Sequence, residues 1–127
     1  MIIDDDEDDR FFFKEALTKL NAAIVCIEAI DGADAIKVLH ASKELPDFIF
    51  LDMNMPRMDG RECLKELKSD TKLKTIKVVM YSTFFSDQSI QEFMQLGAAT
   101  YLKKPTDLNV LLEQIVAAAN RSLQPSI

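Results

Sequence analysis

The stretch DFIFLDMNMPRMDG, residues 47–60, decides the fold of this sequence. It opens with the expected strand Asp47 to Leu51, which is apolar after its first residue, as in a parallel strand that is covered on both faces. The carboxylate of Asp52 follows at the carboxyl end of this strand. In an open sheet of parallel strands, the side chains at these ends converge on one crevice, where ligands bind. Asp52 therefore marks the first candidate for a functional site.

Further short apolar runs flank this stretch and alternate with longer segments of helical periodicity, a pattern typical of βα units around a parallel sheet. The expected strands are Met1 to Ile3, Ala23 to Ile27, Asp47 to Leu51, Ile76 to Tyr81 and Ala99 to Leu102. The expected helices begin near Asp8, cover about Gly32 to Ser42, Gly60 to Lys68 and Asp87 to Leu96, and begin again after the turn Pro105-Thr106-Asp107. We expect Gly97 to end the fourth helix in a left-handed cap, and Thr106 or Asp107 to cap the fifth.

The chain has 127 residues and a formal net charge of −6, from 21 acidic and 15 basic side chains. Its length predicts a single domain over residues 1–127 with no attached output domain. The acidic excess argues against a nucleic-acid partner, because binding to phosphates requires a basic surface. The run Asp4 to Asp9 contains six acidic residues, so this one cluster accounts for the whole excess.

The two cysteines, Cys26 and Cys63, are too few for a disulfide framework and lack the close spacing of a metal site. No apolar stretch approaches the roughly 20 residues that cross a bilayer. No charged leader followed by an apolar run opens the chain. We therefore expect a cytoplasmic protein with reduced thiols and no membrane partner.

Polar side chains follow four of the expected strands at their carboxyl ends. They are Asp4 and Asp5, Asp52, Ser82 and Thr83, and Lys103 and Lys104. Carboxylates brought together repel one another and cannot all stay ionised without a cation, and oxygen ligands suit Mg²⁺. A hydroxyl and an ammonium group from neighbouring strands would add a clamp for phosphate. The residues therefore predict a phosphoryl-transfer site in which a carboxylate could act as the nucleophile.

Four segments of the sequence resemble the receiver domain of two-component response regulators. They are Ile2-Ile3-Asp4-Asp5, Leu51 to Gly60, Ser82-Thr83 and Tyr101-Leu102-Lys103-Lys104-Pro105, and the resemblance covers essentially the entire chain. The type that the chain resembles is the single-domain, CheY-like or phosphorelay kind. The resemblance implies an α/β fold, the doubly wound (βα)5 flavodoxin-like fold, with a five-stranded parallel sheet of order 2-1-3-4-5. It also implies that the protein is a phosphoacceptor switch and not an enzyme. Such a switch assists only its own phosphorylation and dephosphorylation.

The resemblance further implies a role for each acidic site residue. Asp52 would accept a phosphoryl group from a sensor histidine kinase or a histidine phosphotransferase, and the domain would then switch its interactions with a downstream protein. Mg²⁺, or Mn²⁺ in its place, would be bound directly by Asp5 and Asp52. Asp4 would bind the cation mainly through water, and the backbone carbonyl of Asn54 would add another oxygen.

The same resemblance gives roles to residues of the last two strands. Lys104 would bind a phosphate oxygen, and the bond from Lys104 to Pro105 is a candidate cis peptide, an isomer essentially confined to X-Pro bonds. Ser82, which we favour over the neighbouring Thr83, would donate its hydroxyl to the phosphoryl group and move towards it. Tyr101 would follow into the space that Ser82 leaves, linking the site to the surface of the fourth helix, the fifth strand and the fifth helix.

Three positions depart from the pattern of the family. The first strand, Met1 to Ile3, is shorter than usual, so either the native start lies upstream or this edge of the site is less firmly held. Ser82 stands where Thr is commoner. Phe84 lies at a position that helps to set the lifetime of the phosphoryl group. We hypothesise that its bulk hinders the attacking water and lengthens that lifetime.

Three other functions compete with this interpretation. The spacing Asp4-x-Asp6 is similar to that of Mg²⁺-dependent phosphatases of the haloacid dehalogenase type, which use an aspartyl nucleophile. However, Asp8 stands where that family has Thr or Val, and the chain is short for its cap. A flavin-binding electron carrier is disfavoured because no Ser/Thr/Gly-rich phosphate loop follows the first strand. A scaffold that is never phosphorylated is disfavoured because all the expected site residues are present.

Several apolar residues exceed what the inner faces of two helices require. They are Phe11, Phe12, Phe84, Phe85, Ile90 and Met94. Ordinary core packing is one interpretation, and surfaces for partners are the other. In the second interpretation, Phe11 and Phe12 border a docking face for the kinase or phosphotransferase. Phe85, Ile90 and Met94 then contribute to an output face near Tyr101.

Overall fold

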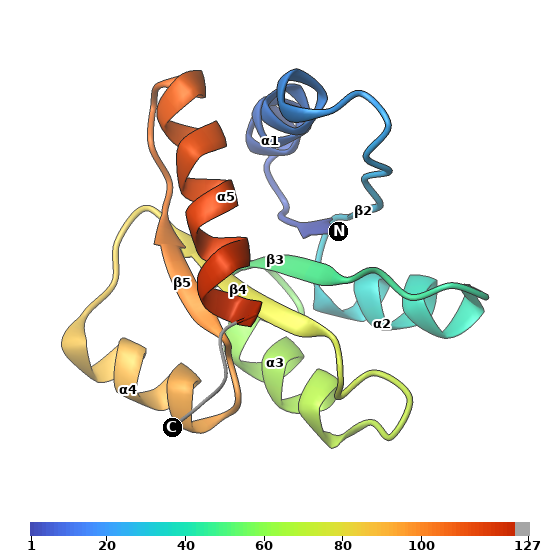
Figure 1. Cartoon of the computed structure of the whole chain (residues 1–127). Coiled ribbons are helices and arrows are strands. Elements are labelled where there is room, and N and C mark those ends of the chain that lie inside the picture. The colour runs from blue at the N-terminus through green and yellow to red at the C-terminus, as the bar shows by residue number, and fades with distance from the viewer. Residues whose placement is uncertain (124–127) are drawn as a thin grey trace.

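The computed structural model describes residues 1–123, which form one parallel sheet between two layers of helices (Figure 1). The strands are β1 (Ile2–Ile3), β2 (Glu28–Ala29), β3 (Phe48–Asp52), β4 (Lys77–Ser82) and β5 (Thr100–Lys103). The helices are α1 (Glu7–Leu20), α2 (Gly32–Ala41), α3 (Gly60–Ser69), α4 (Asp87–Gln95) and α5 (Leu108–Leu123). The strand order is β2-β1-β3-β4-β5 and all neighbours are parallel, which confirms the expected α/β fold and its topology.

The two faces of the sheet bury different sets of side chains, because successive residues of a strand point to opposite faces. Ile3 belongs to the core cluster that includes Leu64 of α3. Ile2, one residue earlier, belongs to the second cluster, with Phe13 of α1 and Ile115 of α5. Figure 1 shows α1 beside α5, and these two helices contact each other, as α2 and α3 do on the other face.

The expected second strand, Ala23 to Ile27, is wrong: the strand β2 comes directly after it. β1 contains only two residues, and these pair with Glu28 and Ala29, so no residue of β1 lies opposite the expected segment. The segment instead begins with a turn, in which the Ile24 N–H donates to the Asn21 carbonyl at 3.0 Å. At every other end for which the sequence predicts a residue, the expected strands and helices differ from the structure by one residue at most.

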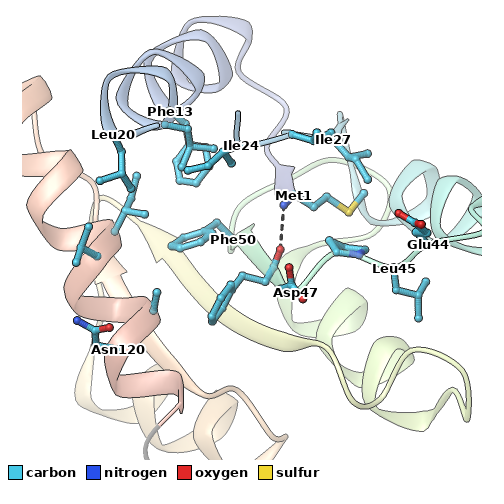
Figure 2. Close-up of a pocket in the computed structure, with 17 residues that line it drawn as sticks. Met1, Phe13, Leu20, Ile24, Ile27, Glu44, Leu45, Asp47, Phe50 and Asn120 are labelled. Atoms are coloured by element: carbon cyan, nitrogen blue, oxygen red, sulfur yellow. Dashed lines mark hydrogen bonds between the residues drawn. The ribbon is translucent and has the colours of Figure 1, made fainter. Parts of the chain in front are cut away.

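An apolar groove of about 590 Å³ lies at the amino end of β1. Figure 2 shows the side chains around the groove. They include Leu20 of α1, Phe50 of β3, Asn120 of α5 and, from the segment between α1 and β2, Ile24. Met1 lines the groove, and its nitrogen donates to the Phe48 carbonyl at 2.9 Å.

Side-chain caps set the starts of the helices, all of which follow carboxyl ends of strands. Asp6 caps α1, Asp31 caps α2 and Asp59 caps α3, each by accepting backbone N–H groups of the first turn. Of the two expected caps of α5, Asp107 makes the contact, because it accepts the Val110 N–H at 3.0 Å. The expected left-handed cap after α4 is confirmed at Gly97, where φ is 105°.

Both cysteine thiols are free, in agreement with the sequence. Cys63 is buried, and this burial raises the pKa of its thiol to about 12, whereas Cys26 is partly exposed. Within residues 1–123, no helix combines the length and the apolar character needed to cross a membrane.

Candidate functional site

Asp4, Asp5 and Asp52 form the centre of the site, at the carboxyl ends of β1 and β3. One carboxylate oxygen from each of the three lies within 4.8 Å of those from the other two. The strand register explains this proximity, because Ile3 pairs with Leu51 and an aspartate follows each of them. Asp4 is completely buried and Asp52 is 5% exposed, whereas Asp5 faces solvent. The structure thus brings together the three carboxylates that the sequence indicates as metal ligands.

The surroundings of Asp52 disfavour its charged form. Burial, and after it the negative charge of Asp4, raises the pKa of Asp52 to about 7, although the charge of Lys104 opposes this shift. A divalent cation would offset the repulsion between the carboxylates. The three donors are carboxylate oxygens, and one of the three residues, Asp5, is exposed to solvent. This donor set fits Mg²⁺ or Mn²⁺.

Lys104 reaches this cluster from the end of β5. Its Nζ donates to Asp4 Oδ2 at 2.7 Å and to Asp9 Oδ2 at 2.9 Å, and it lies 3.7 Å from Asp52 Oδ1. Burial alone would lower the pKa of Lys104, but the hydrogen bonds with Asp4 and Asp9 raise it. The backbone of Lys104 is also fixed, because its N–H donates to the Ser82 carbonyl at 2.7 Å. Lys104 therefore stays charged and supplies positive charge to the acidic cluster.

The loop after β3 folds back on Asp52 and carries Asn54. The Asn54 N–H points at Asp52 Oδ1, 3.4 Å away. The base of the loop is closed by the Gly60 N–H, which donates to the Met53 carbonyl at 3.0 Å. A Cβ at position 60 would collide with the Asp52 carbonyl and would lie 2.7 Å from Met53 Cα, so this close approach requires glycine. The structure thus brings Asn54 next to Asp52.

Ser82 and Thr83 differ sharply in their surroundings. Ser82 is buried, and its hydroxyl donates to the Phe84 carbonyl at 3.1 Å while accepting from the Phe84 N–H at 3.4 Å. Thr83 is exposed. The Phe84 side chain is 72% exposed and packs little against the core. The Ser82 hydroxyl is therefore hydrogen-bonded within the turn that follows β4.

Tyr101 does not join the acidic cluster but packs beside α4. Its ring is 40% exposed and lies 5.2 Å from the ring of Phe85 and 5.8 Å from that of Phe93. Ile90 is partly buried, whereas Met94 is 42% exposed. These residues form a partly open aromatic and apolar surface at the α4–β5 edge of the molecule. It combines features of both interpretations of these residues, core packing and an exposed surface.

The apolar residues of α1 likewise fall into two groups. Phe11 is 60% exposed, whereas Phe12 is half-buried against the core cluster that contains Phe13. Phe11 therefore provides the exposed aromatic surface near the site, and Phe12 is largely a packing residue.

The expected cis peptide bond between Lys104 and Pro105 is wrong. No peptide bond of the described residues 1–123 is cis. The trans isomer is the intrinsically favoured one even before proline.

Three residues of this edge were missed by the sequence interpretation. Asp9, one of the six acidic residues in the run Asp4 to Asp9, is the second acceptor for Lys104. Asp31 is only 2% exposed and accepts from the guanidinium of Arg57. The sequence does not distinguish Asp9 from its acidic neighbours Asp6 and Asp8. No feature of the sequence connects Asp31 with Arg57.

The architecture and the cluster at its carboxyl edge correspond to one known family. Residues 1–116 match the family model of the response regulator receiver domain, so the chain belongs to this family of two-component signalling proteins. Among curated proteins, it is 34% identical to the chemotaxis protein CheY of Pseudomonas aeruginosa, over 91% of this chain and 90% of that protein. It is 31% identical to the sporulation initiation phosphotransferase F of Bacillus subtilis, over 91% of this chain and 88% of that one.

Solved structures of response regulators share the fold. The phosphorylated cyanobacterial phytochrome response regulator RcpA is similar with a TM-score of 0.84 and 30% identity, over 99% of this chain and 94% of that chain. The Mn(2+)-bound form of the response regulator Rcp1 gives a TM-score of 0.78 and 27% identity, over 99% and 94% of the two chains. These matches confirm the two-component interpretation and give no support to the alternative of a haloacid dehalogenase-type phosphatase.

Proposed function

We propose that this receiver domain accepts a phosphoryl group on Asp52 from the phosphohistidine of a sensor histidine kinase or a histidine phosphotransferase. The observation that carries the proposal is the position of Asp52, whose Oδ1 lies 3.7 Å from Lys104 Nζ and whose carboxylate adjoins those of Asp4 and Asp5. A carboxylate oxygen of Asp52 attacks phosphorus, and the bond from phosphorus to the histidine nitrogen breaks with its electron pair left on nitrogen. The product is an acyl phosphate.

The cation in this proposal is Mg²⁺, for which Mn²⁺ can substitute. Asp5 and Asp52 would bind it directly, Asp4 mainly through water, and Asn54 through its backbone carbonyl. When bound, the cation supplies positive charge that balances the phosphoryl oxygens during the transfer. The acidic cluster supports this assignment, and the similar protein Rcp1 has a Mn(2+)-bound form.

Lys104 and Ser82 would recognise the new phosphoryl group. The ammonium of Lys104, now shared between Asp4 and Asp9, would take a phosphoryl oxygen as an additional charged acceptor. The hydroxyl of Ser82 would exchange the Phe84 carbonyl for another phosphoryl oxygen. Thr83 and Phe84 flank this contact, Phe84 as an exposed group that limits access of water to the acyl phosphate.

The signal would leave the site through Tyr101. If Ser82 moves towards the phosphoryl group, the turn that it holds must rearrange, and the neighbouring Tyr101 ring can turn inward. Its present exposed position, against Phe85 and Phe93, leaves it free to do so. Phosphorylation would thus shift the population of two surface states that a downstream protein distinguishes.

We further propose that this receiver domain acts as a switch rather than as an enzyme with an external substrate. The reaction would take place in the cytoplasm, and the partners would be proteins, with no role for nucleic acid or a membrane. The net charge of −6 supports the exclusion of nucleic acid.

The test is incubation with Mg²⁺ and acetyl phosphate, followed by intact mass measurement. We expect one phosphoryl adduct on the wild type and none on Asp52→Asn. Asp47→Asn is the matched control, because Asp47 precedes the same strand at its opposite end and is exposed; it should be phosphorylated normally. An Asp52→Asn variant that still gains the adduct, or a wild type that never gains it, would contradict the proposal. Sustained turnover of a phosphomonoester would favour a phosphatase instead.

A further inference from the structure

Asp31 is a buried carboxylate that the phosphoryl-transfer chemistry leaves unused. It lies two residues after β2, at the carboxyl edge of the sheet, and is 2% exposed. Its Oδ1 caps α2 by accepting the Asp34 N–H at 2.8 Å. A helix cap needs only one oxygen and is usually open to water, so the second oxygen of this buried group requires a partner of its own.

That partner is Arg57, which belongs to the loop between β3 and α3. Its Nε donates to Asp31 Oδ2 at 2.7 Å and its Nη2 donates to the same oxygen. Arg57 has a φ of 64°, a left-handed conformation that residues other than glycine rarely adopt. Backbone strain of this kind persists where the surrounding contacts hold it, and the ion pair with Asp31 is such a contact.

The loop that Arg57 anchors is the one that carries Asn54. Its base is fixed by the bond from the Gly60 N–H to the Met53 carbonyl, and its far side is fixed by the pair of Arg57 with Asp31. A longer contact, from the Gly32 N–H to the Met58 carbonyl at 3.4 Å, joins the same two segments. The tip of the loop is thereby tied to the start of α2, which lies on the same face of the sheet as α3.

We propose that Arg57 and Asp31 are positioning residues that hold the loop after β3 in the conformation in which Asn54 faces Asp52 and the cation. This inference rests on the proposed function, because Asn54 matters only if the site binds a divalent cation. Neither residue touches the reacting atoms. Their effect passes through the backbone between Met53 and Arg57.

The test compares variants that break the pair in different ways. Arg57→Ala removes the pair and keeps the left-handed strain, Arg57→Gly removes both, and Asp31→Asn keeps a capping oxygen but loses the charge. Arg57→Lys keeps a positive charge and should restore part of the wild-type behaviour. Arg61→Ala is the matched control, since Arg61 is an exposed arginine of α3 that pairs with Glu92.

Binding of Mn²⁺, measured by calorimetry, is the first readout. We expect Arg57→Ala, Arg57→Gly and Asp31→Asn to weaken it about tenfold, the lower range for groups that support metal ligands, and Arg61→Ala to leave it unchanged. Positioning also predicts that Arg57→Gly binds Mn²⁺ as poorly as Arg57→Ala although it has the higher Tm. If Mn²⁺ affinity instead follows Tm, or if Arg57→Gly binds like the wild type, the inference is overturned.

Amide hydrogen exchange of Met53, Asn54 and Met55 in metal-free protein is the second readout. Faster exchange in Arg57→Gly than in the wild type supports the positioning of the loop, and unchanged exchange overturns it. This readout separates the two proposals. A wild type that fails to bind Mn²⁺ would contradict the proposed function, whereas exchange would still decide whether the pair holds the loop.

Discussion

Lys104 Nζ lies 2.7 Å from Asp4 Oδ2, closer than the 3.7 Å that separates it from Asp52 Oδ1, although 100 residues separate Lys104 from Asp4 along the chain. The ammonium therefore compensates Asp4 before it compensates the residue that we assign as phosphoacceptor. It occupies part of the charge-balancing role that a cation would take over. Stability of the metal-free protein and affinity for the cation are linked through this contact.

Replacement of Lys104 by Met should make stability depend on the cation. Without metal, we expect the free energy of unfolding to fall by about 3 kcal/mol, because buried carboxylates lose their counter-charge. Mg²⁺ should restore part of this loss, since its positive charge replaces that of the lysine. Thermal unfolding in chelator and in Mg²⁺ checks this, with the exposed neighbour variant Lys103→Met as control. Equal destabilisation under the two conditions would refute the prediction.

Removal of the Asp52 charge should stabilise the metal-free protein above neutral pH. The pKa of Asp52 is raised to about 7 from an ordinary value of 3.8, so the folded state binds a proton that the unfolded state releases. Stability from this group is therefore greatest at low pH and is lost as pH rises from about 4 to about 7. At pH 8 in chelator, we expect Asp52→Asn to be more stable than the wild type by about 2 kcal/mol, allowing for partial solvation.

The pH series is the decisive part of this measurement. The stability difference between Asp52→Asn and the wild type should stay level above about pH 7 and shrink steadily towards pH 4. The exposed variant Glu113→Gln should show no such trend. A difference that does not change between pH 8 and pH 5 would show that Asp52 is not the titrating group.

Phe84→Glu should shorten the life of the acyl phosphate. The side chain is 72% exposed, so the change costs the core little, and a carboxylate there can orient water where the aromatic ring hinders it. We expect autodephosphorylation to accelerate roughly tenfold, less than a full general-base effect. Phe84→Leu keeps an apolar group and serves as the control. An unchanged rate in Phe84→Glu would rule out the shielding role.

Phe11→Ala should weaken phosphotransfer from the cognate kinase without unfolding the protein. Phe11 is 60% exposed, so the free energy of unfolding should change by less than about 0.5 kcal/mol. Loss of an aromatic anchor at an interface costs about 2 kcal/mol, which corresponds to a roughly thirtyfold rise in KM for the receiver. Val25→Ala, which removes another exposed apolar group, is the control. Phosphotransfer at the wild-type KM would exclude Phe11 from the docking face.

Much of the fold could be predicted because the strand ends carry local signals. The apolar run before Asp52, the left-handed Gly97 after α4 and the capping residue Asp107 of α5 stand where the sequence predicts them. β2 could not be placed, because its position depends on which residues β1 offers for pairing and the apolar segment before Glu28 is the stronger strand former in isolation. The pairing of β1 with Glu28 and Ala29 thus outweighed the local strand propensity of the preceding segment.

The site shows the same division. Asp4, Asp5 and Asp52 could be grouped from sequence because parallel strands align their ends. The pairing of Asp31 with Arg57, and that of Asp9 with Lys104, depend on the path of loops and on side-chain reach. Such contacts leave no periodic pattern in the sequence, so they emerge only from the three-dimensional arrangement.

The brevity of β1 places two of the acidic residues directly after a strand of only two residues, which lies between β2 and β3. Two residues of ladder hold this strand on each side, and Asp4 and Asp5 follow at once. A cation that binds these aspartates therefore also stabilises the sheet at β1, because its binding free energy adds to the free energy of folding. In this protein, occupancy of the acidic site and stability of the sheet are therefore thermodynamically linked.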